Sequence, residues 1–176
     1  MDPQWNDVFS VEDTSKKWRR IAARFDWSGL RCGCDQGARH VPSSFAALVA
    51  AQTEEEADGA GLRNHIEVQS MLFESAVPVV SMILAALDEE LLTDAARWGL
   101  LYLLMVLVLG ESEHVEVLSG RPDLELECRD AARDGIPLLY EELRKERVRG
   151  RAEYAICILE ALGEDRDELI AIRRDI

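Results

Sequence analysis

A proline interrupts one of the most apolar stretches of the chain. Residues 70–87 read SMLFESAVPVVSMILAAL, with Pro78 near the middle. Inside a helix, proline removes a backbone donor and clashes with the carbonyl four residues earlier, at a cost of about 3 kcal/mol. A segment this hydrophobic is expected to be a buried helix, so the fold must accommodate the proline within it.

The same pattern recurs around Pro137. Residues 76–80 (AVPVV) align with residues 135–139 (GIPLL), and each stretch precedes a helical segment that begins near an arginine and ends at a glycine, at 97–110 and 151–163. This predicts a repeated pair of antiparallel helices in which the proline bends one helix over its partner. The alternative is that each proline begins a helix in its first turn, where proline is tolerated, without any repeat.

Helical periodicity extends over most of the remaining sequence. One expected helix near the start of the chain has an apolar face formed by Trp18, Ile21, Ala22 and Phe25. Thr53 and Glu56 have the spacing of a capping box. Residues 98–110 form an apolar run that is too short for a membrane span and is typical of a helix buried on all sides.

No segment alternates long enough to indicate a strand. We therefore expect an all-α fold of about seven or eight helices, with antiparallel pairs stacked as a short α-solenoid. A chain of 176 residues is expected to form a single domain. Residues 1–40 would supply an N-terminal helix and a glycine-rich loop, and residues 41–176 the stacked helix pairs.

A resemblance supports this architecture. Val41-Pro42, Leu48, His65 and Ala76-Val77-Pro78 match the pattern of the HEAT-like repeat proteins common in actinobacteria. After the histidine such proteins often continue with a QGTVY-like segment, whereas this chain reads IEVQS. Members of the group include immunity proteins encoded beside the toxins that they inhibit. The resemblance therefore implies a HEAT-like α-solenoid and, as its partner, a toxin.

The chain is strongly acidic. It carries 34 acidic and 20 basic residues, for a net charge of −14. This charge disfavours nucleic acid and anionic membranes and suits a basic protein partner, although it also serves solubility alone. The first residues, MDPQWNDVFSVED, lack the apolar core of a signal peptide, so we expect a cytoplasmic protein with reduced cysteines.

The acidic residues gather at predicted helix connections and helix starts. In a stacked helical array these connections would align into one or two negative edges, which steer a basic partner such as a toxin nuclease. The alternative is that loops carry charges because they are solvated. The candidate partner-binding residues are Glu54, Glu55, Glu56, Asp88, Glu89, Glu90, Glu111, Glu113 and Glu116.

One loop contains residue types that bind zinc. Cys32, Cys34 and His40 form a Cys-x-Cys-x₅-His pattern. This cysteine spacing is tighter than the usual Cys-x₂₋₄-Cys, and the other ligand candidates, His65 and Cys128, lie far along the chain in predicted helices. The prediction is therefore no metal and no cofactor.

No combination of residues predicts catalysis. His65, Glu67 and Glu74 are a candidate acid–base group, but a histidine near a helix C-terminus explains His65 more simply. The sequence lacks the nucleophile and phosphate-loop motifs. The sequence thus favours a non-catalytic protein-binding module. The alternatives are an adaptor or assembly factor that binds a peptide or helix in its groove, and a helical-repeat enzyme.

Overall fold

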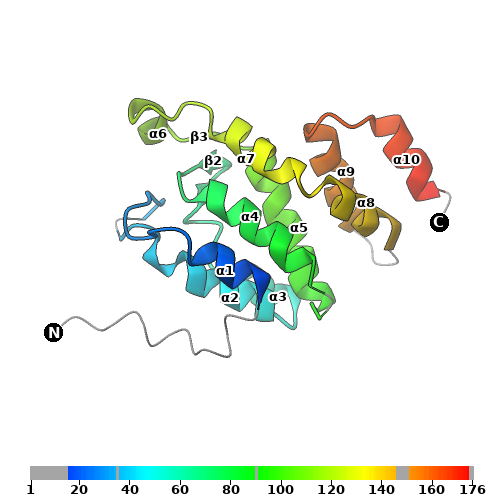
Figure 1. The fold of residues 1–176 in the computed structure, drawn as a ribbon, viewed down its shortest axis with the longest axis horizontal. Coiled ribbons are helices and arrows are strands. Elements are labelled where there is room, and N and C mark those ends of the chain that lie inside the picture. The colour runs from blue at the N-terminus through cyan, green and yellow to red at the C-terminus, as the bar shows by residue number, and fades with distance from the viewer. Residues whose placement is uncertain (1–15, 35, 90, 146–150, 175–176) are drawn as a thin grey trace.

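The chain folds predominantly into helices, as predicted (Figure 1). The computed structural model describes residues 16–34, 36–89, 91–145 and 151–174. The α-helices within these residues are α1 (Lys17–Ala22), α2 (Val41–Ala50), α3 (Glu54–Asp58), α4 (Ala76–Leu87), α5 (Asp94–Leu109), α6 (His114–Leu118), α7 (Leu124–Arg133), α8 (Ile136–Lys145), α9 (Arg151–Ala161) and α10 (Arg166–Arg174). A 3₁₀ turn, η3 (Ala38–His40), leads directly into α2.

The longest of these helices, α5, occupies the centre of the core. It contacts α2, α3, α4, α7 and α9. Its side chains are buried around most of the helix, including Ala96, Leu100, Leu103, Leu104 and Leu107. The prediction of a helix in this run is therefore confirmed, but the helix is not buried on all sides, because Trp98 and Tyr102 are half-buried and Leu109 is exposed. In the part of the chain that the structure describes, no helix has the length and apolar character needed to cross a membrane.

The two prolines begin helices and do not bend them. α4 starts at Ala76 and α8 at Ile136, so Pro78 and Pro137 both lie in a first turn. Backbone N–H groups in the first turn make no hydrogen bond within the helix, so a proline there removes no helical hydrogen bond. The predicted mid-helix bend is wrong, because the apolar residues before α4 are not helical. The stacked repeat itself stays a prediction.

Three two-residue strands lie in two places: β1 (Glu67–Val68) and β2 (Met71–Leu72) in the segment expected to begin the proline-bearing helix, and β3 (Glu111–Ser112) in the loop expected after Gly110. β1 pairs antiparallel with β2, and β2 pairs parallel with β3. Gln69 and Ser70 form the turn between β1 and β2 with positive φ values of 53° and 67°. Strands this short leave no alternation of apolar and polar residues, so the sequence did not reveal them.

Gly110 connects α5 to β3 where the neighbouring chain leaves no space for a side chain. An added Cβ would lie 2.7 Å from the carbonyl oxygen of Ser70 and 2.7 Å from Leu72 Cδ2. The backbone is held there because the Glu111 N–H donates to the same Ser70 oxygen at 2.9 Å.

We expect Gly110→Ala to lower the free energy of unfolding by about 1–3 kcal/mol, because the added methyl overpacks a backbone contact. Gly29→Ala is the matched control, since the nearest neighbouring atoms lie 3.6 Å from the added Cβ and its backbone has no positive φ. Urea denaturation of both variants measures the difference. Equal stabilities would show that the close contact at Gly110 relaxes freely.

Helix α1 packs along α4 and positions the loop that follows it. Trp18 and Ala22 are buried, and the Trp18 ring lies 5.1 Å from the ring of Phe45 in α2. Phe25 lies beyond the end of α1 and is 39% exposed, so it departs from the predicted face.

The predicted capping box begins α3. The Thr53 hydroxyl accepts the backbone N–H of Glu56 at 3.2 Å, and Glu56 Oε2 accepts the N–H of Gln52 at 2.7 Å. The Thr53–Glu56 prediction is thus confirmed, with the return bond reaching one residue further back than in the standard box.

Candidate functional site

The exposed acidic candidates fall into two groups at opposite ends of α5. Glu54, Glu55 and Glu56 are exposed on α3, which lies near the start of α5 because Thr93 donates a hydrogen bond to the carbonyl of Ala51. Asp88 follows α4 at this end, where it pairs with Lys17 of α1. Glu89 is half-buried, and Glu90 lies outside the described residues.

The second acidic group follows the C-terminal end of α5. Glu111 is exposed and Glu113 is half-buried at the start of α6. A helix of 16 residues is about 24 Å long, so this group and the first one are separate surfaces.

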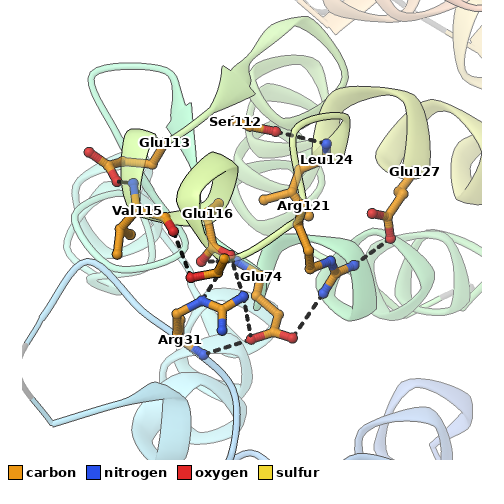
Figure 2. A network of polar contacts seen from close by, with 10 residues as sticks. Arg31, Glu74, Ser112, Glu113, Val115, Glu116, Arg121, Leu124 and Glu127 are labelled. Carbon is orange, nitrogen blue, oxygen red and sulfur yellow. Dashed lines mark hydrogen bonds and ion pairs between the residues drawn. The ribbon is translucent and has the colours of Figure 1, made fainter.

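Glu116 does not belong to either acidic surface. It is fully buried in α6, between the exposed side chains Val115 and Val117. Its inclusion among the partner-binding candidates is wrong, because its carboxylate points into a network of charged groups (Figure 2).

This partly buried network joins segments that are far apart in the sequence. Arg31 donates through Nε and Nη2 to Glu116 Oε2, at 2.9 and 2.6 Å, and the backbone N–H of Glu74 donates to Glu116 Oε1 at 3.0 Å. The Glu74 carboxylate lies 3.3 Å from Arg31 Nη2 and 3.0 Å from Arg121 Nη1, and Arg121 also pairs with Glu127 of α7. The hydrogen bond to Glu116 raises the pKa of Arg31. The network therefore holds the loop after α1, the start of α4, and α6 together.

Exposed apolar side chains are concentrated in the chain segment around the second acidic group. Among the described residues, five of the seven exposed large hydrophobic side chains lie between positions 109 and 126. We call them the α6 surface: Leu109, Val115, Val117, Leu118 and Leu126. Leu118 is 74% exposed. α6 lies at one end of the molecule, away from α8–α10 (Figure 1).

The fold also assembles two cysteines and two histidines. One ligand atom from each of Cys32, Cys34, His40 and His65 lies within 4.8 Å of the other three. The two Sγ atoms are 3.6 Å apart, and Cys32 Sγ is 3.9 Å from His40 Nε2. The rings of His40 and His65 are 4.2 Å apart. Thiolate and imidazole groups in this arrangement are able to hold a transition metal ion.

Sequence reasoning missed His65 as a member of this cluster because it placed the residue in a helix. In the structure His65 lies in a turn after α3, and η3 presents His40 beside it. The other distant candidate, Cys128, is buried in α7 and is not part of the cluster. Glu74, once grouped with His65 as an acid–base candidate, is held by the two arginines.

Backbone contacts fix the loop that carries the cysteines. The N–H of Gly33 donates to the carbonyl of His65 at 2.6 Å, and a Cβ at Gly33 would lie 2.8 Å from Val68 Cγ2. The loop returns to η3 through Gly37, whose φ of +66° favours glycine. Only glycine between the two cysteines allows the loop to approach the turn at His65 so closely.

Burial disfavours the charged forms of Cys32 and His40. It raises the pKa of the Cys32 thiol to about 11. The pKa of His40 is lowered, first by burial and then by the neighbouring His65. A neutral imidazole retains the lone pair that a metal ion requires.

Comparison of the chain with protein-family models, with curated proteins and with solved structures found no match.

Proposed function

We propose that this chain is a non-catalytic protein-binding module and that the α6 surface, with the adjacent Glu111 and Glu113, contacts a basic partner. The observation that carries the proposal is that, among the described residues, most of the exposed large aliphatic side chains fall in the segment that contains these carboxylates. Apolar patches rimmed by polar groups mark protein interaction sites. Each large side chain that is buried on association contributes about 1.5–3 kcal/mol, before the cost of ordering both partners.

Charge supports a basic partner. The net charge of −14 produces a negative field that accelerates encounter with a cationic protein and repels nucleic acid. In this proposal Glu111 and Glu113 contribute locally, while the acidic residues of α3 act only through the long-range field.

The resemblance to HEAT-like immunity proteins suggests the kind of partner. We propose that it is a basic toxin, which this chain neutralises by covering a functional surface. The stacking of the helix pairs as an α-solenoid belongs to the same proposal. A stoichiometric complex in which the captured partner loses its own activity would support this role.

We expect Leu118→Lys to weaken binding of the partner at least about tenfold, because it places a charge in the centre of an apolar contact. The matched control is Leu91→Lys, since Leu91 is 98% exposed outside the α6 surface. The wild-type chain and both variants are used to capture partners from a lysate of the source organism. The affinity of the purified partner is then measured by titration at two salt concentrations.

The variants separate the possible outcomes. Equal affinity of Leu118→Lys and Leu91→Lys for the purified partner would exclude the α6 surface. Binding that is insensitive to salt and to Glu111→Lys would instead favour an adaptor that recognises its partner through apolar contacts alone. Glu54→Lys with Glu55→Lys tests the other acidic group, and Glu56 is left intact because it caps α3.

A further inference from the structure

We propose that Cys32, Cys34, His40 and His65 bind one zinc ion in a closed, four-coordinate site. Nothing in the sequence spacing predicted this set, and the proposal does not depend on the protein-binding function. It rests on the convergence of four zinc-ligand side chains from three separate segments.

Two of the donor–donor distances are close to those of a tetrahedral site. Zn–S bonds of about 2.3 Å and Zn–N bonds of about 2.0–2.1 Å place tetrahedral donors about 3.3–3.8 Å apart. The measured separations are 3.6 Å between the two sulfur atoms and 3.9 Å between Cys32 Sγ and His40 Nε2. All the other donor pairs lie within 4.8 Å, so side-chain rotations that bring each pair closer by at most about 1.5 Å would close the site.

A buried nitrogen in the cluster lacks a hydrogen-bond partner. His65 Nδ1 is shielded from solvent and makes no hydrogen bond. Leaving such an atom unsatisfied costs about 1–3 kcal/mol, and native proteins rarely do so. Coordination through Nδ1 would satisfy it. The backbone of His65 is meanwhile fixed by the N–H of Gly33.

The donor set selects the metal. Two thiolates and two imidazoles at tetrahedral spacing favour zinc over magnesium and calcium, which prefer oxygen ligands. Two thiolates also neutralise the charge of a divalent ion, which lowers the cost of burying it.

With all four positions supplied by the protein, the site is structural. It would tie the loop after α1 to the turn before β1. Arg31, which precedes Cys32, reaches Glu116 at 2.6 Å, so the zinc would also fix the loop from which the buried charge network begins. Metal binding would then contribute directly to folding stability.

The test uses the full chain without a histidine tag, with Zn²⁺ and Co²⁺ as probes. We expect one zinc per chain by elemental analysis, and Co²⁺ should give the intense visible bands of a tetrahedral site with a thiolate charge-transfer band. A chelator should lower the melting temperature. Cys34→Ser and His65→Gln should each weaken zinc binding by more than the roughly 10–100-fold expected for outer-shell partners. The matched controls Cys157→Ser and His114→Gln should bind as the wild type does.

A measurement on the wild type removes any dependence on how well the variants fold. Bound zinc should protect Cys32 and Cys34 from alkylation and leave the labelling of Cys157 unchanged. The proposal is overturned if the reduced wild-type chain takes up neither metal, if it retains metal equally in Cys34→Ser, or if zinc changes no labelling. Recovery of a Cys32–Cys34 disulfide from reduced, zinc-supplied protein would likewise overturn it.

Discussion

Replacement of Arg31 by alanine is expected to lower the free energy of unfolding by about 3 kcal/mol. Among the residues that the structure describes, the change leaves the fully buried carboxylate of Glu116 with the Glu74 backbone N–H as its one close donor. Removing one partner of a buried ion pair costs about 3–5 kcal/mol. We place this case at the lower end because the Arg31 side chain is 36% exposed, so water can enter and solvate the carboxylate in part.

Urea denaturation at neutral pH measures this effect, with Arg166→Ala as the control. Arg166 pairs with Glu160 on the surface, with both side chains largely exposed, so its loss should cost less than about 1 kcal/mol. The double variant Arg31→Met with Glu116→Leu removes both charges and should recover part of the stability. If Arg31→Ala and Arg166→Ala were equally stable, the network would contribute no more than a surface ion pair.

Local patterns in the sequence were reliable where a single element determines them. The apolar run at residues 98–110 could only be a buried helix, and it became the core of α5. The capping box at Thr53 depends on neighbouring residues alone and was predicted correctly. At Pro78 the sequence allowed both a bend and a helix start, and the hairpin of β1 and β2 decided between them.

Features that depend on distant segments could not be predicted in this way. Glu116 looks like a solvated residue in an acidic loop, and only the approach of Arg31, 85 positions earlier, makes its burial tolerable. The cluster of cysteines and histidines required the turn that brings His65 to the loop at residues 32–40. The one local signal was the pattern Cys-Gly-Cys followed by a histidine, which identified three of the four side chains.

The second large effect is expected at Arg97, which connects three helices. Arg97 Nη1 donates to Glu142 Oε1 of α8 at 2.6 Å and to the carbonyl of Leu87 at the end of α4 at 3.2 Å. Its Nη2 donates to the carbonyl of Glu89 at 3.2 Å. The side chains of Arg97 and Glu142 are only 15% and 3% exposed, respectively. Arg151, the first residue of α9, also connects two helices, because its Nη1 donates to Asp94 Oδ1 of α5 at 2.9 Å.

We therefore expect Arg97→Met to lower the free energy of unfolding by about 3–5 kcal/mol. The change leaves the buried Glu142 carboxylate without its charged partner, and the carbonyls of Leu87 and Glu89 without their side-chain donor. Glu142→Gln should cost less, about 1–2 kcal/mol, since the amide oxygen still accepts from Arg97. Denaturant titration of the two variants gives the order of these effects. The opposite order would mean that leaving the Arg97 guanidinium without a charged partner costs more than removing it, so that the ion pair with Glu142 outweighs the hydrogen bonds to the carbonyls of Leu87 and Glu89.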